Sequence, residues 1–360
     1  MQIYRGKELA RFKSRLDRVP DRDVIPVPEH FHDDRLDIRR DVEYALKDPA
    51  TVGEVSRTTF WNEPIELSIS PTETGAVPRT IHNGRPYTRT VDNTHTRMHN
   101  IQMGHVGILE HPSAAATVLG VQFDIKAETQ KPSLGLHRAM QAVGLAKDVV
   151  SLPTYPDLND PYLDAMEGNI MPVGDTNFIT VNEPVVFAMD GSYILVEPDD
   201  SRLILDHQIS YPNNPAIGTQ RIVADMTPEF FAFIASARTP AFGVRSKLAR
   251  LTGFMKSIPT LPYTALGMHN VVAVGKNGIV QPRDKFEASP GGPNLEVLCH
   301  ELIDKAGWLE GLENTHGGRF AGRITTFRTN HTRDIQVAQA MHEQEMIVPV
   351  SSGSQQRRAA

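Results

Sequence analysis

His300 and Asp304 have the residue types and the spacing to bind one metal ion. The stretch from 295 to 306 has the apolar periodicity of a helix. Residues four apart on a helix lie about 40° apart, one turn along. A histidine and a carboxylate in this arrangement suit zinc or iron where no thiolate is present. The same spacing is typical of a solvated ion pair, so both interpretations stay open.

The apolar residues of this helix occupy the arc opposite the His300–Asp304 pair. They are Leu295, Leu298, Cys299, Leu302, Ile303 and Ala306. Because the apolar arc of a helix faces the core, we expect His300 and Asp304 to project from the side that does not face it.

Two further histidines stand where a strand is expected to pass into a helix. Glu110 and His111 lie where the strand-like run 105–110 ends and a short helix, closed by Gly120, begins. His331 follows a strand and precedes a helix that runs to about residue 343. Such junctions place side chains at the rim of a sheet beside a helix N-terminus, where active sites are common. A capping residue or a partly buried histidine explains each position equally well.

Composition limits the kinds of metal site that the chain can build. Its 360 residues include 14 histidines and the single cysteine Cys299, so neither an intramolecular disulfide nor a cysteine-only metal cage is possible. Any metal must therefore be held by His, Asp or Glu.

Charge and hydropathy also narrow the class of protein. The 37 basic and 43 acidic residues give a formal charge of −6, and the basic residues are scattered, so we expect no nucleic-acid partner. The start has no apolar secretory core, and no stretch has the roughly 18 uninterrupted apolar residues of a membrane span. We therefore expect a cytoplasmic protein.

The elements that must position the candidate residues indicate an α+β protein of two domains. Residues 1–53 are rich in charge and proline and are interpreted as an appended N-terminal arm, with an amphipathic helix at 35–46 suggested by Ile38, Val42 and Leu46. Strand-like alternation and short helices fill 54–168. A Pro- and Asp-rich passage follows, and the same texture restarts over 172–345. The tail, 346–360, is expected to be disordered.

Six segments resemble, in order along the chain, segments of one enzyme family. They are 61–71, 109–124 with its Glu-His-Pro, 203–220 with its Pro-Ala-Ile-Gly-Thr-Gln, 236–243 (Ser-Ala-Arg-Thr-Pro-Ala-Phe-Gly), 296–307 (Glu-Val-Leu-Cys-His-Glu-Leu-Ile-Asp-Lys-Ala-Gly) and 322–331, which ends in Asn-His. The family is that of the UDP-3-O-acyl-N-acetylglucosamine deacetylases, zinc amidases of lipid A biosynthesis. The resemblance covers roughly residues 54 to 343, and the common order is more specific than any one segment.

The resemblance implies a fold, a metal and a set of roles. The fold would be two similar α/β-sandwich domains with the active site in the cleft between them. One Zn²⁺ per chain would be held by His111, His300 and Asp304, with Glu110 as the general base. Two further catalytic residues are implied: His331 as the imidazolium that stabilises the oxyanion and protonates the amine, and Thr239 as a hydrogen-bond partner of the intermediate.

The implied activity is zinc-dependent hydrolysis of the N-acetyl group of an amino-sugar derivative, a small-molecule substrate. The substrate would be UDP-3-O-acyl-N-acetylglucosamine or a related glycoconjugate. The oligomeric state stays open.

Several positions depart from the family pattern. Glu301 and Cys299 stand where the family has a lysine and an arginine, so binding of a nucleotide diphosphate is less expected. Trp308 stands where the family has an acid, which leaves His331 without its carboxylate partner unless Asp334 substitutes. We interpret these differences as clues to a diverged substrate.

Two other interpretations remain. A non-catalytic paralog would bind a sugar or a protein partner through the same site. A barrel amidohydrolase would use His30 and His32, but repeated βα units are missing from the sequence. The remaining candidates, His95, His99 and His105, are expected to be structural or to face a substrate.

Overall fold

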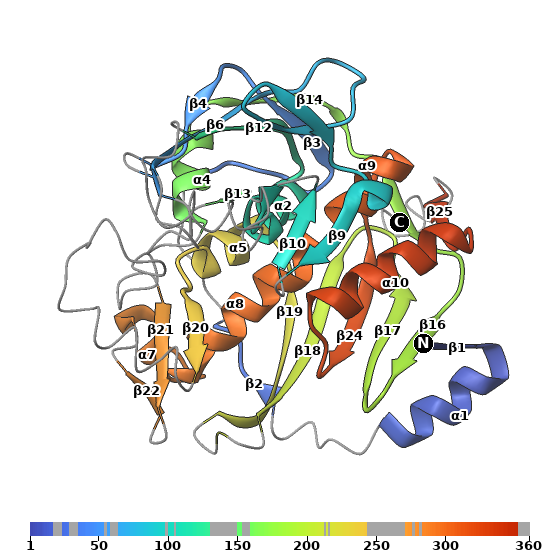
Figure 1. Ribbon diagram of the computed structural model, residues 1–360. Coiled ribbons are helices and arrows are strands. Elements are labelled where there is room, and N and C mark those ends of the chain that lie inside the picture. Colours follow the sequence, from blue (N-terminus) through green and yellow to red (C-terminus); the bar gives the residue numbers. More distant parts are fainter. Residues whose placement is uncertain are drawn as a thin grey trace, which may run out of the picture.

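A computed structural model places two large mixed sheets on either side of a layer of helices (Figure 1). The structure describes residues 1–16, 24–28, 35–53, 56–57, 64–97, 100–103, 106–129, 150–152, 159–211, 214, 217–242, 271–275, 278–280 and 283–351. Antiparallel pairs outnumber parallel ones within each large sheet, which makes the protein an α+β molecule, as the sequence predicts.

Sheet I contains most strands of the first half of the chain. Its main path runs β14 (Ile170–Asp175), β3 (Val42–Leu46), β12 (Val121–Thr129), β6 (Pro64–Pro71) and β4 (Ala50–Thr51). The strand β5 (Ser56–Arg57) pairs with β6, and β7 (Arg79–His82) pairs with β12 and with β8 (Arg85–Thr88). β12 is parallel to β3 and antiparallel to β6.

Sheet II contains most strands of the second half. Its order is β1 (Gln2–Arg5), β16 (Val185–Met189), β17 (Ser192–Pro198), β24 (Gly322–Phe327), β18 (Leu203–Tyr211), β19 (Gly218–Asp225) and β2 (Val24–Ile25). The parallel β18–β24 pair lies at its centre.

Smaller sheets complete the described part of the fold. One has the order β13 (Val150–Ser151), β11 (Val106–Gly107), β10 (Asn100–Met103) and β9 (Thr94–Arg97). Another joins β23 (Arg319–Phe320), β15 (Phe178–Val181) and β25 (Ile347–Pro349), and a third joins β20 (Thr239–Phe242), β21 (Val271–Gly275) and β22 (Gly278–Val280).

The layer between the large sheets is built around two helices. α2 (Glu110–Leu119) packs against β12 of sheet I, and α8 (Asn294–Gly307) packs against β18 of sheet II; the two helices also pack against each other. They are joined by α4 (Asp160–Met166), α5 (Pro228–Ile234), α7 (Asp284–Glu287) and α9 (Glu310–His316). α10 (His331–Glu343) covers β9, β10 and the short 3₁₀ helix Val91–Asn93.

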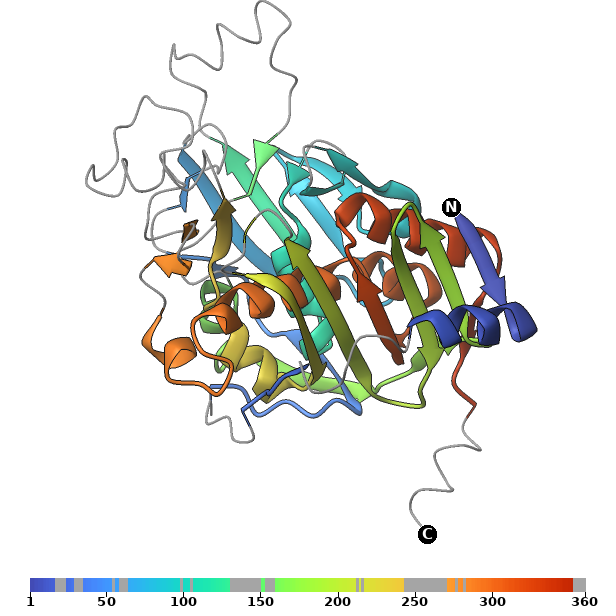
Figure 2. The same ribbon diagram turned by 90° about the horizontal axis from the view of Figure 1, so that it is seen from below.

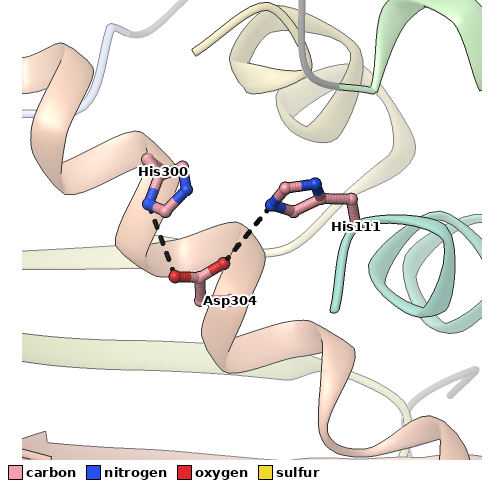
Figure 3. Close-up of side chains that lie close together, drawn as sticks. All are labelled: His111, His300 and Asp304. Carbon is pink, nitrogen blue, oxygen red and sulfur yellow. Dashed lines mark ion pairs between the residues drawn. The ribbon is translucent and has the colours of Figure 1, made fainter. Parts of the chain in front are cut away.

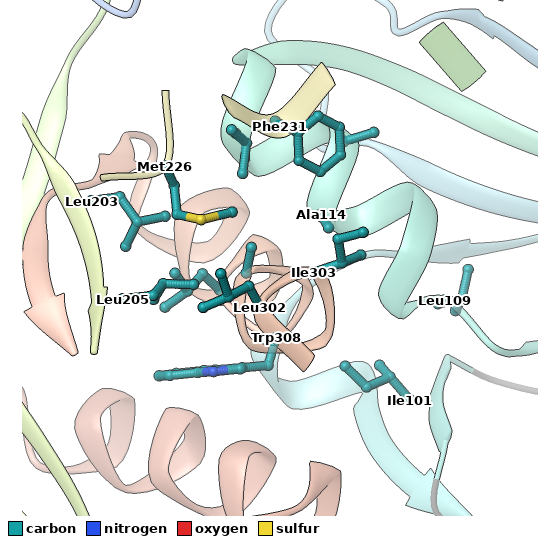
Figure 4. Close-up of a cluster of buried hydrophobic side chains, with 14 of the residues drawn as sticks. Ile101, Leu109, Ala114, Leu203, Leu205, Met226, Phe231, Leu302, Ile303 and Trp308 are labelled. Carbon is teal, nitrogen blue, oxygen red and sulfur yellow. The ribbon is translucent and has the colours of Figure 1, made fainter. Parts of the chain in front are cut away.

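Both halves contribute to the buried core between the sheets. Figure 4 shows Ala114 of α2, Ile303 of α8 and Leu205 of β18 among its members, together with Phe231 and Trp308. Each of these five side chains is at most 1% exposed. Through this continuous apolar core, both sheets pack against the same helices.

Residues 1–53 supply strands to both large sheets. β1 and β2 extend sheet II, whereas β3 and β4 belong to sheet I. α1 (Gly6–Leu16) packs against β16, and Figure 2 shows it at the edge of the molecule. The division of the chain at 53, 168 and 345 stays a prediction. The disorder predicted from residue 346 is wrong for the start of the tail, because Ile347–Pro349 form β25 and pair with β15.

The helix predicted at 35–46 is wrong, because residues 42–46 form the strand β3. Ile38, Val42 and Leu46 fit a helical period, but Tyr44 and Leu46 also alternate at the strand period and are both buried. Pairing with β12 and β14 on both sides decides in favour of the strand. The predicted helix 137–143 and much of the Pro- and Asp-rich passage lie outside the described residues.

Local signals explain several other element ends. Thr227 caps α5, where its hydroxyl accepts the N–H of Phe230, and Pro228 is the first helical residue. Gly120 ends α2 at φ 66°, as its position in the sequence predicts. Within the described chain, every helix is too short or too polar to span a membrane.

Gly307 fixes how closely α8 approaches the start of α2. A Cβ at this position would lie 2.2 Å from the backbone oxygen of Glu110 and 2.9 Å from its Cα. Real Cβ atoms do not approach backbone so closely, so only glycine allows this contact.

We predict that Gly307→Ala destabilises the protein by about 3 kcal/mol, because α2 or α8 must shift within a packed core. Urea unfolding of the two proteins measures the difference. Gly174→Ala is the matched control, since a Cβ there has no atom within 4 Å, and we expect a change below about 0.5 kcal/mol. An unchanged stability for Gly307→Ala would contradict the described contact.

Glu313 connects α9 to α2 and to β23. Its carboxylate accepts the hydroxyl of Thr117 and the N–H of Phe320, each at 2.8 Å. Burial raises the pKa of Glu313 to about 7, although these two hydrogen bonds and nearby Arg319 lower it. Between about pH 4.5 and pH 7, Glu313 is therefore protonated in the folded protein and ionised in the unfolded chain.

Because the pKa of Glu313 is higher in the folded state, its contribution to stability is present at low pH. We predict that this contribution falls by about 3 kcal/mol as the pH rises from about 4.5 to about 7, and then levels off. Urea unfolding across this range should show a weaker pH dependence in Glu313→Gln than in the wild type. The exposed Glu343→Gln is the control and should keep the wild-type dependence.

Candidate metal centre

His111, His300 and Asp304 converge at the contact between α2 and α8 (Figure 3). One potential ligand atom from each lies within 4.8 Å of the others, and within the described residues this is the one such group of three. His111 Nε2 is 3.9 Å from Asp304 Oδ1, and His300 Nδ1 is 3.4 Å from Asp304 Oδ2. The two imidazole rings meet edge to face with centroids 5.8 Å apart. The three predicted ligands are therefore close enough to bind one ion.

The elements explain this convergence. α2 begins at Glu110, so His111 lies in its first turn, next to the backbone that contacts Gly307. His300 and Asp304 lie one turn apart on α8, and Gly307 ends that same helix. The close approach of the two backbones therefore brings the histidine of one helix to the pair on the other.

His300 and Asp304 are each only 5% exposed, so the side of α8 opposite its apolar arc is also buried and the alternative of a solvated ion pair is wrong. The apolar arc of α8 is buried as expected, but the opposite arc is covered by α2 and α10. A helix that lies between two sheets can be buried on its polar side as well. The apolar pattern of the sequence indicates only the side that faces the core, not the helices that cover the opposite side.

Burial sets the protonation of the three side chains. It lowers the pKa of His300 to about 4 and lowers the pKa of His111 well below its usual range, with neighbouring histidines adding to the effect on His111. Both rings are therefore neutral near pH 7 and keep a lone pair for a metal. Burial, together with the negative charge of Glu301 and Glu110, raises the pKa of Asp304 well above its usual range.

The donor set fits a bound cation. Both ring nitrogens of His300 and the Oδ1 atom of Asp304 are buried without a hydrogen-bond partner among the described residues. Buried polar atoms are almost always paired, so this gap indicates a missing partner. A divalent cation would bind one ring nitrogen of His300 and Oδ1 of Asp304, and it would stabilise the carboxylate that burial disfavours. Two histidines and one carboxylate suit catalytic zinc, which uses three protein ligands and keeps one position open.

Glu110 precedes the ligand His111 and is 3% exposed. Its carboxylate accepts the backbone N–H of Ile101 at 3.1 Å, which orients the side chain from β10. Burial raises the pKa of Glu110 to about 7, and the backbone hydrogen bonds oppose this shift. A carboxylate with a pKa near neutrality is well matched to accept a proton at physiological pH.

His331 is the first residue of α10 and faces the same centre. Its Nε2 atom lies 3.5 Å from Asp304 Oδ2. The suggested partner Asp334 is wrong: its carboxylate binds Lys305 Nζ at 2.7 Å, and both of these side chains are buried. The carboxylate that faces His331 is therefore the predicted metal ligand.

Thr239 opens β20, which packs against α8. Its hydroxyl is buried and has no hydrogen-bond partner among the described residues. A free buried hydroxyl is available to a bound molecule, but the role of Thr239 stays a prediction.

His207 and Tyr211 of β18 form a group beside the ligands that the sequence did not reveal. Tyr211 donates its hydroxyl to Glu301 Oε1 at 3.2 Å, and His207 Nε2 lies 3.7 Å from Glu301 Oε2. Burial alone would raise the pKa of Glu301, but His207 and the charge of Lys305 outweigh it and lower the pKa to about 2. The consecutive polar residues 206–208 in an otherwise apolar strand were the signal that could have indicated this group.

The remaining histidine candidates do not join the centre. His95 lies on β9, and its ring nitrogen Nδ1 is 3.4 Å from the backbone oxygen of Asn93. Four other candidates lie outside the described residues: His30, His32, His99 and His105.

We predict that metal-free protein binds one Co²⁺ or Zn²⁺ per chain, and that His300→Ala and Asp304→Asn weaken binding at least about 100-fold by removing a ligand. Titration followed by cobalt absorption measures both stoichiometry and affinity. His95→Ala is the matched control and should bind as the wild type does. Equal affinity in all four proteins would contradict this ligand set.

Comparison with known families gives one match. The family model described as LpxC, UDP-3-O-acyl N-acetylglycosamine deacetylase, matches residues 160–343, about half of the chain. The matched range contains Thr239, His300, Asp304 and His331, whereas Glu110 and His111 precede it. The comparison with curated proteins returns no match.

Proposed function

The chain belongs to the UDP-3-O-acyl N-acetylglycosamine deacetylase family, and on that premise we propose that it is a zinc-dependent N-deacetylase of an amino-sugar derivative. The family comprises deacetylases of lipid A biosynthesis, so the chain belongs to a family of hydrolases. Zinc, the exact substrate and a cytoplasmic location are part of the proposal.

The position of His111 is the main support for this proposal. His111 lies outside the range that matches the family, yet its ring lies beside His300 and Asp304 from within that range. Separate parts of the chain therefore supply the complete ligand set that the resemblance implies, adjacent to the acid Glu110 and to His331. Chance placement of an isolated ion pair would not bring these groups together.

The proposed chemistry begins with the metal. A zinc ion bound to His111, His300 and Asp304 would polarise the amide carbonyl and lower the pKa of a water molecule. Amides need this help because the carbonyl is a poor electrophile.

The residues of the chain then handle the protons. Glu110, oriented by the N–H of Ile101, would accept the proton of the attacking water. His331, held 3.5 Å from Asp304, would in its protonated form donate a proton to the leaving nitrogen. The hydroxyl of Thr239 would donate a hydrogen bond to the developing oxyanion.

Glu301 and Cys299, on either side of the ligand His300, are two departures from the family pattern that concern the substrate. Cys299 is fully buried, and the interpretation that its replacement of an arginine is a clue to the substrate stays a prediction. Glu301 adds a negative charge next to the ligand pair and is held by Tyr211. A carboxylate here disfavours an anionic diphosphate, which supports a related glycoconjugate with less negative charge as the substrate.

We predict that Glu110→Gln retains bound zinc but lowers the turnover of acetate release by about 100- to 10,000-fold, because the general base is lost and the ligands are not. Acetate release would be measured on UDP-3-O-acyl-N-acetylglucosamine and on simpler N-acetylated amino sugars. The exposed Glu128→Gln on β12 is the matched control and should keep full activity.

Zinc content separates this proposal from a non-catalytic binding protein. Purified wild-type protein should contain about one zinc per chain and release acetate from at least one member of the panel. Protein that lacks a divalent transition metal under metal-replete conditions, or full activity in Glu110→Gln, would overturn the proposed mechanism.

A further inference from the structure

A pocket lies on the face of sheet II that is turned away from the metal centre. It has a volume of about 820 Å³, within the range of small-molecule sites, and we call it the arm pocket because residues of β1 and α1 form one wall. The turn between β16 and β17, the ends of β18 and β24, and the start of α10 form the rest. Its lining contains none of the residues assigned to the metal centre.

Aromatic rings line the arm pocket in a continuous series. Tyr4 and Phe12 are stacked with centroids 5.3 Å apart, Phe12 meets Tyr193 edge-on at 5.8 Å, and Tyr193 lies 5.7 Å from Phe327. All four rings line the pocket and are only partly buried. Such rings offer surfaces on which a flat heterocycle can stack.

Gln208 supplies a polar group that no neighbour uses. The residue is 5% exposed and lines the pocket, and its side-chain amide makes no hydrogen bond to any described residue. The residue lines the pocket, so a ligand bound there can use this amide. Its paired donor and acceptor can bind the edge of a nucleobase.

Charged groups of both signs complete the lining. Arg333 uses one guanidinium nitrogen on the backbone oxygen of Arg328, and its other donors are available to the pocket. Arginine donors suit a phosphate group. Asp190, in the turn between β16 and β17, also lines the pocket and can accept the hydroxyl groups of a ribose.

We propose that the arm pocket binds a nucleoside monophosphate, with the base stacked against the aromatic rings and hydrogen-bonded to Gln208 and the phosphate on Arg333. A free nucleotide and the nucleotide part of a larger conjugate share this chemistry. Tyr4 and Phe12 precede the range 160–343 that matches the family, so one wall of the site lies outside that range.

The position of the pocket separates this binding from catalysis. Gln208 and Phe327 alternate along their strands with His207 and Thr326, which face the metal centre and hydrogen-bond to each other. Substitutions at the arm pocket therefore leave the ligands and Glu110 in place.

The test is calorimetric titration of the purified full chain with the four common nucleoside 5′-monophosphates, the corresponding nucleosides, one nucleotide sugar and N-acetylglucosamine. We expect at least one monophosphate to bind with a Kd below about 1 mM, and Gln208→Leu to weaken it at least about fivefold. Arg333→Gln should weaken the monophosphate and leave the nucleoside unchanged. Tighter binding of the nucleotide sugar than of the free monophosphate would identify the larger conjugate as the source.

Matched controls lie outside the pocket. Gln122→Leu on β12 and the exposed Arg202→Gln should bind the monophosphate as the wild type does, and thermal unfolding confirms that every variant is folded. The proposal is overturned if no nucleotide binds, if Gln208→Leu and Arg333→Gln leave nucleotide affinity unchanged, or if only N-acetylglucosamine responds to these substitutions. Each result is independent of deacetylase activity.

Discussion

The backbone contact between Gly307 and Glu110 is the constraint on which the candidate site depends. It sets the distance between α2, which packs on sheet I, and α8, which packs on sheet II. Because Glu110 and His111 begin one helix and His300, Asp304 and Gly307 belong to the other, one close approach positions the base and all three ligands. Any side chain larger than hydrogen at 307 would separate the two halves of the site.

The helical layer contains many charges that water does not reach, and pairing accounts for most of them. Lys305 binds Asp334, Arg238 binds Glu296, and Glu301 lies between Tyr211 and His207. Only paired or coordinated charges are tolerated in such an environment. The metal ligands differ in their partners, since Asp304 lies beside three histidines, His111, His300 and His331, rather than beside a lysine or an arginine. That contrast distinguishes a binding site from the structural ion pairs around it.

The sequence predicts correctly the features that depend on local preferences or on the order of segments along the chain. The cap of α5, the end of α2 at Gly120 and the α+β class follow from short-range preferences. Its predictions are wrong where contacts with distant parts of the chain decide the structure. Residues 42–46 became a strand because β12 and β14 pair with them, and the far arc of α8 is buried because α2 and α10 cover it. Asp334 was assigned to His331 by proximity in sequence, but it pairs with Lys305 across two helices.

The sequence by itself determined the donor types, the i, i+4 pair and the family order of the segments, because these depend only on residue identity and spacing. Only the tertiary structure brought His111 to that pair, enclosed the centre between two sheets and assigned Glu301 to Tyr211 and His207. It alone placed Tyr4 and Phe12 beside Gln208 and Arg333. The physical reason is the same in each case: contacts between residues ninety or more positions apart depend on how whole layers pack, and no local pattern encodes that packing.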